Sequence, residues 1–416
     1  MLPLALLLFF GLLTLWVPAR WPLSLFQAGV FALALPYALR IARWSAPILA
    51  SAPPPSLRRI GAPLVQAAPG FPALPLAAAA LWAAFQLATR STVYRHATFE
   101  ALLYWATALV VYLLARQLFD DPRLRHRFLR LLVYFAFAVS VLASLQYFSS
   151  EGKVLWLFPM PYAPPLATFQ YRNDYSAFLE LLLPIALFEA LADRRRALLF
   201  TAMAGAMYAS VIAGASRAGS VLLTLEILLV LLVALARRDL PGHTVRSVLS
   251  RAAVFAAIFT AVVGWQILWG RFFVPDPYVG RRELLLSSIA MLRDRPLTGH
   301  GLGAWPEAYP AYALFDIGAF ANHAHNDWAE WAAEGGLPFL LMILALALWT
   351  VRPALRSLWG LGVPVFFLHC WVDYPTRRLP IAAVLFVLIA ALASRSSPPE
   401  PINSVWNNDS GPRSSP

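Results

Sequence analysis

The chain alternates long hydrophobic runs with short polar stretches. Runs such as "PLALLLFFGLLTLW" and "SVLLTLEILLVLLVAL" approach the length of about 20 residues at which an apolar helix crosses a bilayer. The pattern therefore predicts an all-α, polytopic integral membrane protein with about twelve transmembrane helices. The predicted spans are residues 2–17, 22–40, 71–89, 97–115, 131–149, 173–192, 197–214, 219–236, 252–270, 336–351, 357–372 and 379–393.

The polar stretches divide the chain into a membrane domain, a long loop and a tail. Residues 1–393 form the membrane domain, in which residues 271–335 form a large, partly helical loop before the tenth span. The linker 52–70 is rich in Pro and Ala and is expected to be a loop on the cytoplasmic side. Residues 394–416 are polar and rich in Ser and Pro, which predicts a disordered cytoplasmic tail.

Basic residues are divided unevenly between the two predicted sides of the membrane. When the 33 Lys and Arg residues are assigned to alternate sides of successive spans, twenty fall on one side. Of the other thirteen, five lie in the loop 271–335. Because cytoplasmic loops carry the excess of positive charge, both termini are expected in the cytoplasm and the loop 271–335 on the outer side of the membrane.

The overall composition limits the partners of the chain. It is 60% hydrophobic and 13% charged, with a formal net charge of +12. The basic residues, of which only Lys153 is a lysine, punctuate the spans without forming a long patch, so membrane lipids are expected as partners and nucleic acid is not. The single cysteine, Cys370, lies in an apolar stretch and is expected to be a small buried hydrophobe.

The loop 271–335 carries much of the candidate chemistry. Its piece "RRELLLSSIAMLRDRP" spaces Leu285, Ile289 and Leu292 at helical intervals, which predicts an amphipathic helix near the membrane interface that ends at Pro296. The glycine-rich "GHGLG" comes next. A phosphate-binding loop is one interpretation of it, but a plain flexible turn is favoured because so short a motif occurs often by chance.

The stretch "NHAHNDWAEWAAEGGLP", residues 322–338, places several polar and charged groups next to an apolar run. Its composition predicts a short helix that closes at Gly335 and Gly336. Trp328 and Trp331 on this helix suit a membrane interface.

The histidines of this stretch suggest two kinds of chemistry. His323 and His325 would ligate a metal if Asp327, His300 or His369 completed the shell, but no second ligand pair has a diagnostic spacing, so no metal is predicted. A neutral histidine is also suited to general-base catalysis, and His325 is the candidate for that role.

Single arginines stand at the outward ends of several spans. They are Arg172 in "TFQYRNDYSAF", Arg217 in "GASRAGS", and Arg281 and Arg282 in "GRRE". A charge near membrane depth is costly and points to a function, and a planar guanidinium binds phosphate through two donors at once. With a histidine base, this set is suited to moving a group off a lipid phosphate without a nucleotide, cofactor or metal.

Other charged residues of the outward loops are expected to have ordinary surface roles. Arg377 and Arg378 in "VDYPTRRLP" are expected to reach lipid headgroups. Glu330 and Glu334 are expected to lie on the solvated face of the short helix.

These elements together resemble the O-antigen ligase and polymerase superfamily. "GRRELLLSSIAMLRDRPLTGHGLGAW" and "HAHNDWAEWAAEGG" are similar to its Gly-Arg, "PLxGxGxGxF", "HxHN" and "ExG" elements, with Ala304-Trp305 as a departure. "TFQYRNDYSAFLELLLP" is similar to "GTFxNxNxxAxxLxxxLP", although Ala167 and Tyr171 depart from it. "GASRAGSVLL" is similar to "xxSRxxxxxL", and "LHCWVDYPTRRLP" to the last loop of the family, which contains His and Asp. The resemblance covers about residues 90–393.

The resemblance implies a metal-independent, inverting glycosyltransferase that takes a glycan from undecaprenyl pyrophosphate. It implies a site on the periplasmic face of the bacterial inner membrane, where Arg217 and Arg281 bind the pyrophosphate and His325 deprotonates the acceptor hydroxyl. Arg172 would be a further phosphate or sugar contact. Three neighbouring residues are added as candidate substrate contacts: Arg282, His323 and Asn326.

The motifs leave the acceptor open. A ligase would use lipid A core, a polymerase the growing glycan, and a protein O-oligosaccharyltransferase a serine or threonine hydroxyl. An alternative from another class is a non-catalytic transporter of the same lipid-linked glycan. Loss of His325 would be tolerated by the transporter and not by the enzyme.

Overall fold

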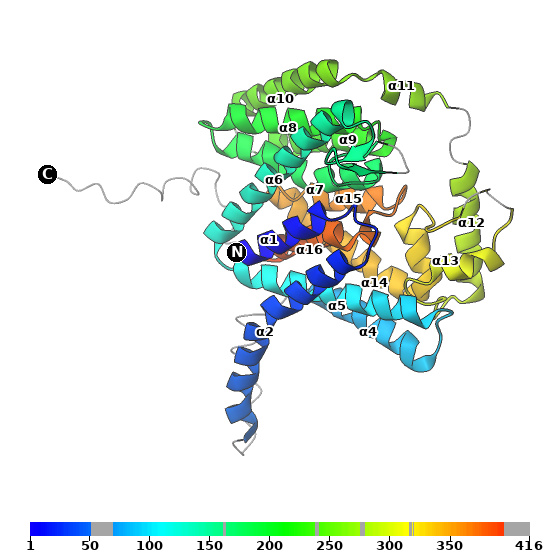
Figure 1. Ribbon diagram of the computed structural model, residues 1–416. Coiled ribbons are helices and arrows are strands. Elements are labelled where there is room, and N and C mark those ends of the chain that lie inside the picture. Colours follow the sequence, from blue (N-terminus) through cyan, green and yellow to red (C-terminus); the bar gives the residue numbers. More distant parts are fainter. Residues whose placement is uncertain are drawn as a thin grey trace.

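The computed structural model describes residues 1–50, 70–160, 164–237, 241–274, 279–315, 318 and 320–394 (Figure 1). The predicted linker and tail lie outside the described residues except for Gly70 and Ser394. The α-helices are α1 (Leu2–Leu13), α2 (Trp21–Ala50), α4 (Ala73–Thr89), α5 (Arg95–Leu118), α6 (Pro122–Ser149), α7 (Arg172–Ala192), α8 (Ala197–Ala213), α9 (Arg217–Ala236), α10 (Gly242–Val263), α11 (Gln266–Phe272), α12 (Val279–Asp294), α13 (Trp305–Ala308), α14 (Asp327–Ser357), α15 (Gly362–His369) and α16 (Leu379–Ala393). The short elements are the antiparallel pair β1 (Lys153–Val154) and β2 (Phe158–Pro159), and the 3-10 turns η1 (Tyr309–Ala311) and η2 (Pro375–Arg377).

Polar residues cap the helices that begin near the candidate chemistry. The Ser216 hydroxyl accepts a hydrogen bond from the amide of Gly219 at 3.1 Å and so starts α9. The Asn326 side-chain oxygen accepts one from the amide of Ala329 at 3.0 Å and starts α14. These caps set the positions of Arg217, the first residue of α9, and of the "HAHN" segment, which directly precedes α14.

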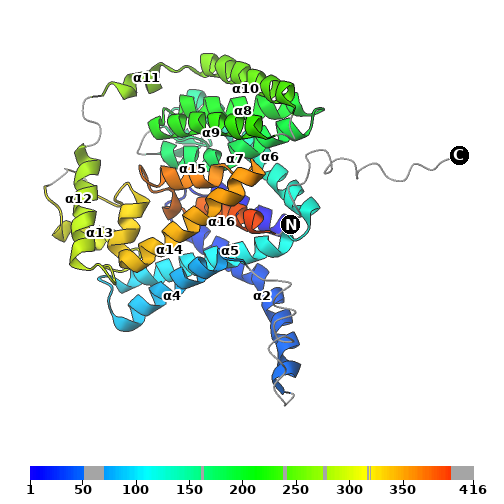
Figure 2. The same cartoon turned by 180° about the vertical axis from the view of Figure 1, so that it is seen from behind.

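The bundle has a buried centre with other helices around it. Helices α7 and α16 are buried along nearly their whole length. Figures 1 and 2 show α8, α9 and α10 on one side of this centre and α4 and α5 on the opposite side. Helices α12 and α13 lie beside the start of α14. They share a second, smaller core with it, formed by Leu284, Met291, Trp305, Ala308, Tyr309, Ala324 and Ala333.

The predicted all-α membrane fold agrees with the structure at the level of helices. Within the described residues, six helices are long and apolar enough to cross a membrane: α5, α6, α7, α9, α10 and α14. Five shorter apolar helices match further predicted spans. The count of twelve spans and the orientation of the chain stay predictions.

The eleventh predicted span differs most from the structure. Residues 357–372 contain only the eight-residue helix α15. At 1.5 Å per residue this helix is ~12 Å long, well short of the ~30 Å hydrocarbon core. Its buried residues pack against α7, and an added Cβ at Gly362 would collide with the backbone of Glu180. The apolar run therefore reflects burial inside the protein, which hydropathy alone does not distinguish from a span.

The loop 271–335 is helical in part, as predicted. Helix α12 covers the expected amphipathic segment and ends before Pro296. The face predicted to be apolar, Leu285, Ile289 and Leu292, is only half-buried. The buried positions of the helix include Leu284, Ser287, Ser288 and Met291. The break predicted at the glycine pair is confirmed, because Gly336 has φ of 70° and interrupts the helical geometry of α14.

Candidate active site

The candidate site is centred on a pair formed by His325 and Asp373. His325 Nδ1 lies 3.2 Å from Asp373 Oδ1. The carboxylate can only accept, so Nδ1 carries a proton, and in the neutral form of the ring Nε2 is then the acceptor. The His325 side chain is 38% exposed and the Asp373 side chain 6% exposed, so the pair presents its histidine outward.

The backbone of His325 is in an unusual conformation. Its φ of 51° is in the left-handed region, which a residue with a Cβ adopts at a cost. The residue is the last before Asn326, whose cap begins α14, and the amide of Asp327 donates to the carbonyl of Cys370 at 2.8 Å. The start of α14 is thus tied to the loop that carries Asp373, and this junction holds the imidazole against the carboxylate.

Several groups surround the Asp373 carboxylate. The amide of Tyr374 donates to Oδ1 at 3.1 Å, the Asn173 side-chain amide donates to Oδ2, and Arg281 Nη2 lies 3.7 Å from Oδ2. Burial by itself would raise the pKa of Asp373, but the hydrogen bond and charge of His325, followed by the charge of Arg281, outweigh it and hold that pKa below its usual range. Asp373 therefore remains ionised and able to orient its histidine.

The four predicted arginines differ in how closely they join this network. Arg281 reaches it directly, since its Nη1 donates to the carbonyl of Val372 at 2.8 Å beside Asp373. Arg282, the next residue on α12, is exposed. Arg217 begins α9 and donates to the carbonyl of Arg271 at 3.2 Å, and Arg172 begins α7. The geometry thus brings Arg281 to the carboxylate that pairs with His325, while Arg172 and Arg217 begin α7 and α9, next in sequence to Asn173 and Ser216.

His323 is fixed by a different group of residues. Its Nδ1 lies 2.9 Å from Glu330 Oε1, and its ring lies 4.3 Å from that of Tyr374. Tyr374 also contacts the ring of His325, with 4.8 Å between centroids. Both histidines therefore pack on one tyrosine, but only His325 is paired with Asp373.

The expectation of solvated glutamates and a lipid-facing arginine is wrong. Glu330 and Glu334 are both 1% exposed. Arg377 Nη2 lies 3.1 Å from Glu330 and 2.9 Å from Glu334, and its Nε lies 3.6 Å from Asp327. The first turns of α14 pack inside the protein, where three carboxylates need one shared cation.

Arg378 is also paired with a carboxylate. Its Nε donates to Asp174 at 3.1 Å, and its guanidinium lies 5.3 Å from the centre of the Tyr171 ring. Burial alone would lower the pKa of Arg378, but the neighbouring Asp174 raises it, so the side chain stays charged. The headgroup contact predicted for it is thus replaced, in this structure, by a contact inside the protein.

The prediction of interfacial tryptophans in this stretch is wrong. Trp328 and Trp331 are 7% and 3% exposed and belong to the main core, so they are not interfacial. Trp328 Nε1 donates to the carbonyl of Phe367 at 3.0 Å, which docks α14 on α15. The oxygen of Asn326 is used as a helix cap, which gives this residue a structural task, and its substrate contact stays a prediction.

The "GHGLG" segment is a packed turn. Gly299, Gly301 and Gly303 all have positive φ, and an added Cβ at any of them would collide with a neighbouring residue. The amides of His300 and Gly301 donate to the carbonyls of Ala333 and Glu334 at 3.0 and 2.9 Å. The preferred interpretation as a turn is confirmed, although the turn is held by α14 and is not free. Its amides face protein carbonyls in place of a phosphate.

The histidines considered as extra metal ligands are engaged elsewhere. His300 lies 3.1 Å from the carbonyl of Met291, and His369 Nδ1 lies 2.8 Å from Glu180. In the part of the chain that the structure describes, no group of three or more His, Cys, Asp or Glu side chains is arranged to hold a metal.

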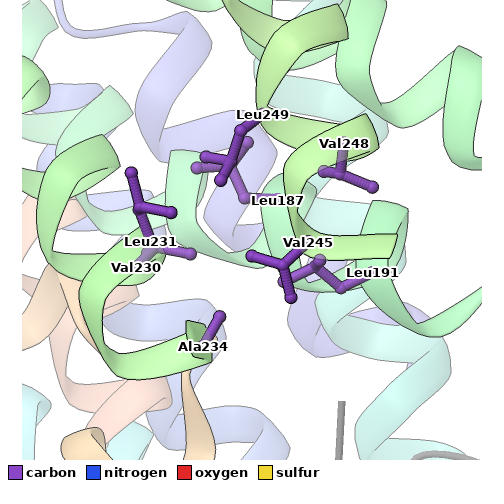
Figure 3. A pocket seen from close by; sticks show the side chains of 8 residues that line it. All are labelled: Leu187, Leu191, Val230, Leu231, Ala234, Val245, Val248 and Leu249. Atoms are coloured by element: carbon purple, nitrogen blue, oxygen red, sulfur yellow. The ribbon is translucent and has the colours of Figure 1, made fainter. Parts of the chain in front are cut away.

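An apolar pocket lies at the other end of the bundle. Figure 3 shows its lining, which comes from the ends of α7 and α9 and the start of α10: Leu187, Leu191, Val230, Leu231, Ala234, Val245, Val248 and Leu249. Helices α7 and α9 begin at the candidate site, so this pocket is separated from it by most of their length. It carries no group that could take part in chemistry.

Two residues of the site were not identified as functional from the sequence. Asp373 and Asn173 stand in the quoted segments "VDYPTRRLP" and "TFQYRNDYSAF", but their pairing joins positions 200 residues apart. The signal was present as polar residues at span ends, and only the fold shows that they meet.

Comparison with known families supports the resemblance noted in the sequence. The family model for O-antigen ligase matches residues 200–344, a range that contains Arg217, Arg281 and His325. The match confirms the resemblance to the O-antigen ligase superfamily, and with the apolar helices it indicates a multi-pass membrane protein. A search of curated proteins finds no match.

Proposed function

We propose that this protein is a glycosyltransferase that moves a glycan from undecaprenyl pyrophosphate to an acceptor hydroxyl. The observation that carries the proposal is the His325–Asp373 pair with Arg281 on the same carboxylate. Both His325 and Arg281 fall inside the range matched by the O-antigen ligase family. The proposed location is the periplasmic face of the bacterial inner membrane, and the acceptor is lipid A core, a growing glycan or a protein hydroxyl.

The proposed reaction is a single displacement. The acceptor oxygen attacks the anomeric carbon while its proton passes to His325 Nε2. The bond from that carbon to the pyrophosphate oxygen breaks, and its electron pair leaves with undecaprenyl pyrophosphate, so the configuration inverts. Arg217 and Arg281 stabilise the charge that develops on the leaving group, with Arg172 as a further contact. The proposed reaction requires no metal or nucleotide.

The test of this proposal uses purified protein in detergent or vesicles. The protein is incubated with undecaprenyl-pyrophosphate-linked glycan and each acceptor class separately, without nucleotide sugar and with excess chelator. Transfer to one acceptor and release of undecaprenyl pyrophosphate support the proposal. Movement of the lipid-linked glycan across the vesicle membrane without transfer would instead support the transporter.

The arginines give a prediction about charge and shape. Arg217→Lys or Arg281→Lys keeps the charge but loses the two-donor fork, so transfer is expected to fall about 10- to 100-fold, the range for hydrogen bonds to charged groups. Arg282→Lys is expected to lose less, because Arg282 is exposed. Initial rates at matched membrane abundance measure the effect.

The matched control for Arg281 is Arg293→Lys, an exposed arginine on the same helix α12. It is expected to transfer at the native rate. Native rates in both the Arg217→Lys and Arg281→Lys proteins would contradict the two-donor role.

Asp373 gives a prediction about the orientation of the base. Asp373→Asn keeps the shape but removes the charge that holds the proton on His325 Nδ1, so the rate of transfer is expected to fall at least about 10-fold. Asp294→Asn, an exposed carboxylate bound to the Tyr312 hydroxyl, serves as the control. Equal rates for the two variants would show that Asp373 does not orient the base.

A further inference from the structure

Asn173 joins the two halves of the candidate site. Its Nδ2 donates to Asp373 Oδ2, and its Oδ1 accepts a hydrogen bond from the Ser216 hydroxyl at 2.8 Å. Asp373 holds His325, and Ser216 immediately precedes Arg217. One amide therefore connects the carboxylate of the base to the helix that carries a proposed pyrophosphate ligand.

The chemistry of its partners fixes the orientation of this amide. The ionised Asp373 carboxylate can only accept, so it must face the NH2 group. The opposite orientation would place two oxygens against each other. The amide oxygen then faces Ser216, whose hydroxyl also accepts from the Gly219 amide and lies 3.2 Å from the Ser176 hydroxyl.

Close packing keeps α7 and α9 at this distance. Gly219 on α9 has no side chain, and an added Cβ would collide with Ser176 on α7. The Ser176 hydroxyl donates to the carbonyl of Asn173 at 3.0 Å. Ala215, just before Ser216, has a φ of 53°, which turns the chain into α9. The first turns of the two helices are thus locked together with Asn173 between them.

We infer that Asn173 is a positioning residue that holds the Asp373–His325 pair in register with Arg217. This inference rests on the proposed function. Asn173 holds Asp373 Oδ2, so that Oδ1 faces His325, and it holds the start of α9 at the same time. The base and the pyrophosphate ligand are then set at one spacing before substrate binds.

The decisive variant is Asn173→Asp, which keeps the shape and replaces the NH2 group with an oxygen. Two adjacent carboxylates share one proton, so the pair titrates with one pKa raised. When the shared proton is present, it bridges the two side chains as the amide does. When it is lost at higher pH, the carboxylates repel and Asp373 is displaced. The rate of transfer is expected to fall about 10- to 100-fold on the alkaline side, and less on the acidic side.

The control is Gln170→Ala in the same loop. Gln170 donates to the carbonyl of Trp16 at 2.8 Å, so its loss weakens the loop without touching Asp373. We expect this variant to keep the native pH profile of kcat. The inference would be overturned if kcat of Asn173→Asp followed the native pH dependence at alkaline pH. It would also be overturned if Asn173→Asp and Gln170→Ala lost transfer activity equally at every pH. If the native protein transfers glycan, and transfer is lost in His325→Ala but unchanged in Asn173→Asp, this inference alone is rejected. If the native protein does not transfer glycan, the proposed function is rejected.

Discussion

The His325→Ala variant is expected to lose detectable glycan transfer and to remain folded. The imidazole is 38% exposed and its removal leaves no cavity in the core. The ring is the group that takes the proton of the acceptor hydroxyl, and a positioned general base contributes ~10²–10⁴-fold to a rate. Transfer from lipid-linked glycan, measured with purified protein at equal membrane abundance, gives the comparison.

His323→Ala is the matched control, since both histidines pack on Tyr374. His323 contacts Glu330 and is not paired with Asp373, so its loss is expected to be milder. If His325→Ala retains transfer and His323→Ala does not, the base is the other histidine. If both variants transfer normally, the "HAHN" segment has only a structural role.

The Arg377→Met variant is expected to destabilise the protein by about 3–5 kcal/mol, the cost of removing one partner from a buried ion pair. Three buried carboxylates would lose their shared cation. Burial alone would lower the pKa of Arg377, but the charges of Glu330, Glu334 and Asp327 together raise it above its usual range, so the cation is permanent. Thermal unfolding in detergent, followed by loss of monodisperse protein, measures the change.

Two variants sharpen this test. Arg378→Met removes a neighbouring arginine that has one carboxylate partner and a side chain 33% exposed, so its effect on stability is expected to be clearly smaller. Arg377→Lys keeps the charge but not the several donors, so it is expected to recover part of the loss. Equal unfolding temperatures for Arg377→Met and Arg378→Met would contradict the role of Arg377 as the shared cation.

The sequence predicted most helices because a helix in lipid must be apolar over a known length. The same criterion failed for α15, where the apolar residues pack against α7 and α14 within the protein. It also failed for Glu330, Glu334 and Arg377, since hydropathy counts each charge separately. The cation that neutralises Glu334 lies 43 residues away, and nothing local to either residue reveals the pair.

The candidate site could be predicted in part for a related reason. His325 and Arg281 stand in one loop with recognisable motifs, and the structure brings them to the same carboxylate. That carboxylate, Asp373, is 48 residues from His325, and another of its donors, Asn173, is 200 residues away. Residue type at the end of a span identifies candidates, but only the packing of α7, α9 and the last loop selects the ones that meet.

The cluster around Arg377 also bears on the order in which the protein folds. The start of α14 carries Asp327, Glu330 and Glu334, and the folded protein buries all three. Their counter-charge follows 43 residues after Glu334, which at about 5–20 residues per second is a delay on the order of seconds. During that interval the nascent chain holds an unneutralised acidic segment beside a hydrophobic helix. We therefore expect the first turns of α14 to stay in a polar environment until the ribosome has delivered the last loop.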